Sequence, residues 1–164
     1  MDTSDLLQFL KDYGIAYSYH EHAAVYTSRQ ARELIGPLPG ASAKNLFLRD
    51  KRGKRHFLLT MDDRKNADLK ALAANQCISG LSLASPERLM RYLGVSPGAV
   101  SLMSLVNDKE GKVEVLIDKD LWSSGALQCH PLINTATLVI PLEGIITFLS
   151  IIHHPPKLVK IPSS

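Results

Sequence analysis

Apolar and polar positions repeat with two different periods along the chain, and these periods separate predicted strands from predicted helices. The clearest strand pair covers 44–49 and 55–61, where apolar runs flank a short basic segment that contains a glycine. Such a pair predicts a hairpin. Six further segments are rich in strand-forming residues and are predicted as strands: 15–20, 81–84, 100–105, 113–118, 135–140 and 153–161.

Predicted helices are marked by capping residues at their starts and, in two cases, by glycines at their ends. Four are predicted: 6–13 with Ser4 or Asp5 as cap and Gly14 as end, 31–35 capped by Thr27 or Ser28, 67–74, and 86–93 capped by Ser85 and ended by Gly94. Two segments stay open: 118–122 is a turn or a short helix, and 142–150 is a helix or a mixture of strand and helix.

The order of these elements predicts an α+β fold, because several strands are neighbours and strands do not alternate strictly with helices. No repeat, low-complexity segment or linker interrupts the 164 residues, and this length fits one domain with its own core. We therefore expect a single domain over 1–164.

Composition narrows the class of protein. Apolar residues make up 45% and charged residues 21%, as in ordinary globular proteins. No run is long enough to span a membrane, and the acidic start at 1–5 lacks the features of a signal peptide, so a cytoplasmic protein without membrane contact is expected. The two cysteines, Cys77 and Cys129, have no zinc or redox spacing and are expected as thiols.

The net charge of +3 allows contact with a polyanion but does not demand it. Basic residues are densest at 51–55, in the predicted hairpin turn. Two interpretations stay open for this turn: a solvated surface turn, or a contact with a phosphate backbone.

Common enzyme signatures are absent, including the phosphate-binding loop, the dinucleotide fingerprint and the nucleophile elbow. The close histidine pairs, at 20/22 and 153/154, come without an obvious third ligand, so no metal site is expected. Cys129 and His130 are adjacent, and neighbours on a strand point to opposite faces. A nucleophile–base pair is therefore disfavoured, and Cys129 is expected in the core.

Three segments remain as candidates for chemistry. Lys44 follows small residues and opens an apolar strand, so it either holds a phosphate in a pocket or is a surface lysine. The loop 94–100 contains two glycines and a proline, and it either presents backbone amides to an anion or only ends a helix. The segment 130–137 carries a histidine, an amide and hydroxyls, as either a pocket wall or a structural turn.

Four segments in order, 43–50, 83–89, 92–98 and 130–137, together resemble the free-standing prolyl-tRNA editing proteins of the YbaK/ProX type. The similarity extends from Glu21 to the last strand and is greatest to the branch that hydrolyses alanyl-tRNA(Pro). It implies an α+β fold with a mixed, mostly antiparallel, barrel-like sheet and flanking helices. It also implies hydrolysis of the ester of mischarged tRNA(Pro), without a cofactor, with the tRNA acceptor end and prolyl-tRNA synthetase as partners.

The resemblance further implies which residues form the site. The catalytic positions it indicates are Lys44, Gly98 and His130, with Lys44 as a substrate anchor. The substrate-binding positions it indicates are Tyr26, Thr27, Asn45, Ala99, Ser101, Asn134 and Thr135.

One position departs from the family pattern. The family's glycine loop commonly has a proline where this chain has Leu102, and a proline would fix the backbone of the loop. Two alternatives therefore stay open beside the alanyl-tRNA(Pro) deacylase. They are a deacylase for cysteinyl- or seryl-tRNA, and a non-catalytic module that binds the tRNA end.

Overall fold

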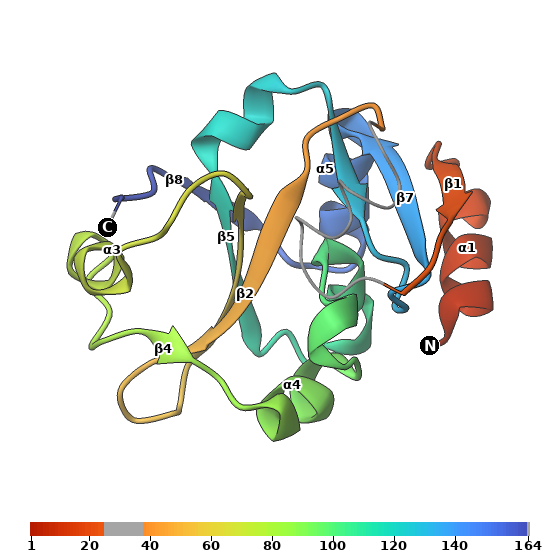
Figure 1. The fold of residues 1–164 in the computed structure, drawn as a ribbon. Helices are drawn as coiled ribbons and strands as arrows, with labels where there is room; N and C mark the ends of the chain where they lie inside the picture. The colour runs from red at the N-terminus through yellow and green to blue at the C-terminus, as the bar shows by residue number, and fades with distance from the viewer. Residues whose placement is uncertain (25–37, 164) are drawn as a thin grey trace.

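The strands of the protein form two sheets, one of five strands and one of three. The computed structural model describes residues 1–24 and 38–163 (Figure 1). The larger sheet has the order β4 (Ser82–Leu83), β2 (Ala43–Arg49), β3 (His56–Asp62), β5 (Val113–Asp118), β8 (Pro156–Val159). The smaller sheet has the order β1 (Ser18–Glu21), β7 (Ala136–Pro141), β6 (Ala126–Cys129).

Helices pack against both sheets. The described α-helices are α1 (Thr3–Asp12), α3 (Leu69–Asn75), α4 (Pro86–Leu93) and α5 (Leu142–Ile151). Three 3-10 helices complete the list: η1 (Pro97–Ala99), η2 (Leu102–Asn107) and η3 (Lys119–Ser123). The helix expected at 31–35 lies outside the described residues, as does its expected cap. No helix within the described ranges is long and apolar enough to cross a membrane.

The larger sheet is mixed. β2 pairs antiparallel with β3, which confirms the predicted hairpin, and β4 adds antiparallel to β2. β3 and β5 pair in parallel, as do β5 and β8. The expected α+β fold with a mixed sheet is thus confirmed, although the strands form two sheets and not one closed barrel.

Among the described residues, one parallel bridge connects the two sheets, between Ala41 and Leu127. It brings the chain just before β2 beside β6. Gly40 makes this approach possible, because a Cβ there would lie 2.9 Å from the Ala126 carbonyl oxygen and its φ is +83°. A side chain at this position would be strained by the left-handed backbone and would collide with β6.

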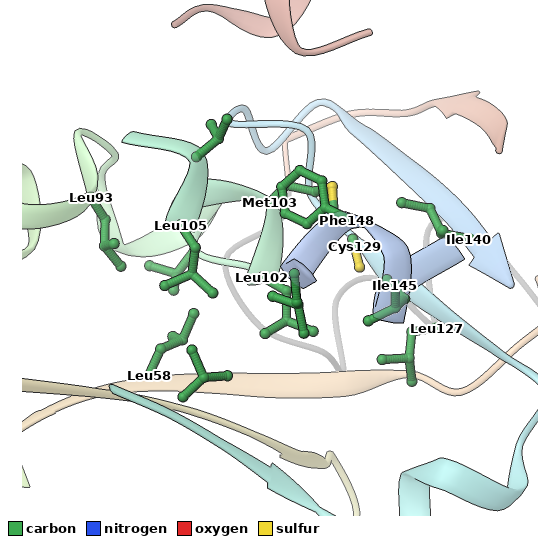
Figure 2. Close-up of a cluster of buried hydrophobic side chains, with 14 of the residues drawn as sticks. Leu58, Leu93, Leu102, Met103, Leu105, Leu127, Cys129, Ile140, Ile145 and Phe148 are labelled. Carbon is green, nitrogen blue, oxygen red and sulfur yellow. The ribbon is translucent and has the colours of Figure 1, made fainter. Parts of the chain in front are cut away.

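Two apolar clusters fill the interior. The larger lies between the sheets and contains Leu58 from β3, Leu127 and Cys129 from β6, and Phe148 from α5 (Figure 2). The smaller lies on the other face of the five-stranded sheet, where Leu72 of α3 packs against the strands. Because β2 and β3 contribute alternate residues to the two clusters, both strands are covered on both faces.

The ends of α4 and α1 show which of the predicted capping residues form the caps. Ser85 accepts a hydrogen bond from the amide of Arg88 at 3.2 Å, and α4 ends at Gly94 with φ +68°, as predicted. The cap predicted for α1 was wrong. Asp2 is the cap, since Asp2 and Asp5 exchange reciprocal bonds between side chain and backbone in a capping box.

The strand predicted at 100–105 was also wrong. That segment forms η2, and Ser101 begins it by accepting a hydrogen bond from the amide of Met103. Residues 102–106 are all buried, Ser104 included, so the run has no exposed positions from which a period could be read. The open segment 142–150 is helical, as α5, and the segment 118–122 forms η3.

Candidate functional site

The three-stranded sheet has one apolar face and one face that is mostly polar, with Val139 as its buried apolar residue. Leu138 and Ile140 of β7 point into the larger cluster, as do Leu127 and Cys129 of β6. The intervening residues point the other way, because side chains alternate along a strand. This second face, called the polar face below, carries Ser18, His20, His22, Gln128, His130 and Thr137.

His22 is fixed by hydrogen bonds on both ring nitrogens. Nδ1 lies 2.7 Å from the Ala23 carbonyl oxygen, which only accepts, so Nδ1 carries the proton. Nε2 then accepts a hydrogen bond from the Thr137 hydroxyl at 2.9 Å. The backbone amide of His22 also donates to the Thr135 carbonyl at 3.0 Å. His22 therefore clamps the start of β7.

His130 lies beside this clamp at the end of β6. Its Nδ1 is 3.3 Å from the Ala136 carbonyl oxygen, which places the ring proton on Nδ1. Burial lowers the pKa of His130, and the nearby His22 lowers it further. The ring is thus neutral at pH 7. Within the described part of the chain its Nε2 has no hydrogen-bond partner, so a lone pair is available to a ligand.

The glycine loop is joined directly to the His130 segment. Ser101, which is 1% exposed, donates from its hydroxyl to the His130 carbonyl oxygen at 2.6 Å. Gly98 and Ala99 belong to η1, and the Ala99 amide is bonded to Ser96 within that turn. Ala99 and Ser101 are buried, whereas Gly98 is half-buried. The segment is also held from α1, where Thr3 donates to the Pro131 carbonyl oxygen at 2.6 Å.

Lys44 and Asn45 point to opposite faces of β2. Lys44 is half-buried and shares the face of Leu46 and Leu48, on the side of the smaller cluster. Asn45 faces the other side, where its carbonyl oxygen accepts a hydrogen bond of 2.7 Å from Thr60. No described residue forms a hydrogen bond or ion pair with Lys44, so its ammonium group is available within that part of the structure.

The bridge between the sheets brings the Lys44 and His130 segments together. Ala41 and Leu127 are paired in parallel, so both chains run the same way from that point. Lys44 and His130 each follow three residues later. Gln128 strengthens the junction, since its backbone amide donates to the Ala41 carbonyl at 3.0 Å.

Of the remaining predicted site residues, two are described by the structure and two are not. Asn134 is half-buried and Thr135 exposed, in the turn that leads from His130 into β7. In that turn Leu132 adopts φ +70°. Tyr26 and Thr27 lie outside the described residues. The sequence reasoning missed His22, although the resemblance begins at the neighbouring Glu21, because the histidine was considered only as half of a metal-type pair.

Cys129 has no part in this polar face. Its thiol lies in the larger cluster, and burial raises its pKa to about 12. The thiolate, which is the nucleophilic form, is therefore not populated near neutral pH. This confirms that Cys129 is a core residue placed apart from its neighbour His130. Across residues 1–24 and 38–163, no three His, Cys, Asp or Glu side chains are grouped to hold a metal ion.

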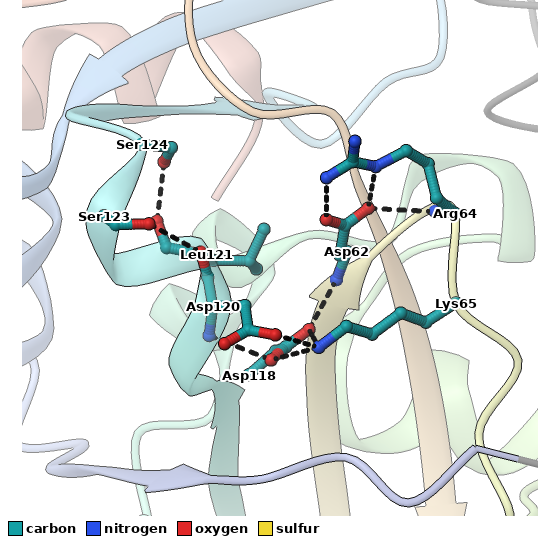
Figure 3. A network of polar contacts seen from close by, with 8 residues as sticks. All are labelled: Asp62, Arg64, Lys65, Asp118, Asp120, Leu121, Ser123 and Ser124. Carbon is teal, nitrogen blue, oxygen red and sulfur yellow. Dashed lines mark hydrogen bonds and ion pairs between the residues drawn. The ribbon is translucent and has the colours of Figure 1, made fainter.

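A charged network supports the end of β3, opposite the start of β2 (Figure 3). The Lys65 ammonium group lies 3.0 Å from Asp118 and 2.7 Å from Asp120. The Asp62 amide donates to the Asp118 carboxylate at 3.1 Å, and the Asp62 carboxylate binds the Arg64 guanidinium through two of its nitrogens. The network joins β3, β5 and η3, and so fixes the sheet beside Lys44.

Comparison with known proteins identifies the class of protein to which this chain belongs. The protein is a hydrolase that acts on the ester bond of aminoacyl-tRNA. Residues 22–148 match the family described as the aminoacyl-tRNA editing domain, and the chain belongs to that family. The resemblance to the prolyl-tRNA editing proteins is thereby confirmed.

Two relatives and one solved structure illustrate the similarity. The prolyl-tRNA editing protein ProX of Acetoanaerobium sticklandii is 37% identical over 136 residues, which is 83% of each chain. The prolyl-tRNA synthetase associated domain-containing protein 1 of Danio rerio is 31% identical over 158 residues, covering 95% of this chain and 85% of that protein. A structure provisionally assigned as a trans-editing enzyme for prolyl tRNA synthetase has the same fold, with TM-score 0.71, 17% identity and 99% of each chain covered.

Proposed function

We propose that the protein is a trans-editing deacylase that hydrolyses mischarged tRNA(Pro), with alanyl-tRNA(Pro) as its preferred substrate. The observation that carries the proposal is the hydrogen bond of 2.6 Å from Ser101 to the His130 carbonyl oxygen, which joins the glycine loop to the backbone of the His130 segment. The prolyl-tRNA editing protein that is 37% identical supports tRNA(Pro) as the tRNA.

The ester substrate needs no strong protein nucleophile, since an aminoacyl ester is activated toward water. A water oxygen attacks the carbonyl carbon, the bond to the ribose oxygen breaks, and that oxygen leaves with a proton from the water. The neighbouring ribose hydroxyl assists the attack. This route suits a site whose nearby thiol, that of Cys129, has its pKa raised to about 12. Positioning and oxyanion stabilisation then carry the catalysis.

Each site residue has a distinct role in this proposal. The Lys44 ammonium group anchors a phosphate of the terminal nucleotides. The Nε2 lone pair of His130 orients the α-ammonium group of the bound amino acid, and Asn134 borders the same pocket. Backbone amides near Gly98 stabilise the oxyanion. Selection of alanine over proline is steric, because a pocket excludes a larger side chain better than it rejects a smaller one.

The test is a deacylation panel with tRNA(Pro) charged with alanine, cysteine, serine or proline. Release of alanine is expected to be fastest, and proline is expected to stay attached. Lys44→Ala is expected to abolish hydrolysis while the protein stays folded, with Lys157→Ala, an exposed lysine on β8, as the matched control. Equal slow release of all four amino acids would refute the alanine assignment. Binding without any hydrolysis would favour a non-catalytic module, and full activity of Lys44→Ala would refute the anchor.

A further inference from the structure

The turn between β2 and β3 carries a dense group of basic side chains. Lys51, Arg52 and Lys54 are exposed there, at the same end of the large sheet as α4 (Figure 1). No carboxylate in the described part of the chain forms an ion pair with these three side chains. Arg55, which follows them directly, differs because its guanidinium group forms an ion pair of 2.8 Å with Glu114.

Two arginines from different elements converge on this turn at Gly53. A Cβ on Gly53 would lie 2.8 Å from Nη2 of Arg49 and 3.0 Å from Nη2 of Arg88, and its φ is +67°. Arg88, from α4, donates to the Gly53 carbonyl oxygen at 3.1 Å, and Arg49, from β2, donates to the Lys51 carbonyl oxygen at 3.3 Å. Backbone carbonyls thus hold two like-charged groups close together.

The other titratable groups around the turn do not cancel the positive charge of its arginines and lysines. Arg91 lies one turn beyond Arg88 on α4, is exposed, and has no carboxylate within ion-pair distance in the described ranges. Buried His56 accepts a hydrogen bond from Arg88 at 3.0 Å, and its pKa is lowered by burial and by the arginines, so it adds no charge. Asp50 uses one carboxylate oxygen on the amides of residues 54 and 55.

The cation cluster is defined here as Arg49, Lys51, Arg52, Lys54, Arg88 and Arg91. Counted with Arg55 and with the carboxylates of Asp50, Glu87 and Glu114 on the same described elements, this group has a local charge of +4. The whole chain carries +3. All of the protein's net positive charge is thus gathered at one end of the sheet, and the remainder is close to neutral.

We propose that the cation cluster binds the phosphate backbone of the paired acceptor stem of the tRNA, separately from the site that holds the 3′ end. This inference rests on the proposed function for the identity of the RNA. Arg49 and Lys44 are five residues apart on β2, about 17 Å at the usual rise per residue, and their side chains leave opposite faces of the strand, so it is the turn at the end of β2 that lies at this distance along the strand axis. A stem leading away from an esterified end at Lys44 would present phosphates at that distance. Arginine forks suit phosphate oxygens, and such contacts position an RNA without reading its sequence.

α4 connects the cluster to the site. Arg88 and Arg91 lie on this helix, and the chain continues from Gly94 to Gly98 in the glycine loop. A stem held on α4 would therefore be positioned relative to the loop that contacts the ester. The cluster is expected to act on substrate affinity and not on the chemical step.

The test uses a Lys51→Gln/Arg52→Gln/Lys54→Gln variant, and separately Arg91→Gln, because Arg49 and Arg88 also hold the turn together. The matched control is Lys70→Gln/Lys119→Gln/Lys157→Gln, which removes three exposed lysines outside the cluster. Binding of uncharged tRNA(Pro) is measured against salt concentration. The triple cluster variant is expected to bind at least tenfold more weakly, with a salt slope smaller by about 1–3, since each phosphate contact contributes about 0.9 to that slope.

Deacylation kinetics separate this proposal from the proposed function. With alanyl-tRNA(Pro), the cluster variant is expected to raise KM about tenfold at unchanged kcat. With an alanylated oligonucleotide limited to the unpaired 3′ end, it is expected to match the wild type. Equal binding and salt slopes for cluster and control variants would overturn the cluster proposal, as would a lost kcat on the short substrate. No hydrolysis by the wild type would overturn the proposed function, while the binding arm would still decide on the cluster.

Discussion

The Ser101 hydroxyl donates a hydrogen bond of 2.6 Å to the backbone carbonyl oxygen of His130, and this bond joins two chain segments that are distant in sequence. Because Ser101 also caps η2, one buried side chain sets the relation between the glycine loop and the histidine. The bond lies within the protein interior, where its loss leaves a carbonyl without a partner.

Ser101→Ala is therefore expected to lower kcat/KM for deacylation at least tenfold and to destabilise the fold by about 1–2 kcal/mol. Ser124→Ala is the control, since Ser124 makes a bond of the same 2.6 Å length to the Leu121 carbonyl, on η3 and outside the proposed site. It is expected to cost some stability while activity stays at the wild-type value. Equal activity of the two variants would contradict a positioning role for Ser101.

The protonation of His130 predicts the pH dependence of the reaction. Burial lowers its pKa from the ordinary value of 6.5, so the neutral ring persists to a lower pH than that of an exposed histidine. If the neutral ring orients the substrate, kcat/KM has no transition from His130 near pH 7 and falls with a midpoint below 6.5. His130→Asn is expected to lose this acid limb, and the pH profile of both proteins checks it. An acid limb that survives in the variant would assign the titration to another group.

The two cysteines are expected to differ sharply in reactivity. Cys77 is exposed, whereas Cys129 is buried and has its pKa raised to about 12. A thiol reagent at pH 8 is expected to modify one cysteine per native molecule, and two after unfolding. Mass mapping identifies the site. Loss of activity that tracks modification of Cys129 in the native protein would contradict its placement in the core.

Asp62 is expected to contribute to stability above pH 4 and to lose that contribution in acid. The hydrogen bonds from Arg64 lower the pKa of Asp62 from 3.8 to about 2 in the folded protein. A lowered folded-state pKa stabilises the fold above the unfolded value, and the effect disappears as pH falls from about 4 toward 2. This difference corresponds to about 2 kcal/mol.

Asp62→Asn is accordingly expected to be less stable than the wild type at pH 7, with the gap closing by pH 2. Urea unfolding across this pH range gives both free energies of unfolding. A gap that stays constant with pH would show that the ion pair in Figure 3 contributes nothing through the charge of Asp62.

Local signals predicted those elements that are specified by nearby residues. The hairpin of β2 and β3 follows from two apolar runs around a glycine turn, and α4 follows from Ser85, Pro86 and Gly94. The 3-10 helix η2 was predicted as a strand because its buried residues carry no period. β6 was not predicted, since four residues between a turn and a histidine give too little pattern.

The candidate site also depends on contacts that local sequence patterns do not reveal. Lys44 and His130 were predicted as site residues, but the segments that carry them are joined by the bridge between Ala41 and Leu127, which no spacing reveals. His154 is a related case: the sequence shows it beside His153, whereas in the fold its ring pairs with the Asp108 carboxylate at 2.9 Å. Contacts between distant segments decide both outcomes.

The parallel pairing of β3 with β5 has a consequence for how the chain folds. His56 pairs with Val113, and Val115 with Pro156, so only the β2–β3 hairpin of the larger sheet can form from neighbouring residues. Each of the other strand pairs joins segments that are far apart in the sequence. A long loop must therefore close before such a pair forms, and this slows folding. We expect the hairpin to form early and the C-terminal strand to dock late. Substitutions in β8 should then mainly accelerate unfolding. The candidate site should reach its native arrangement only after β8 has paired with β5.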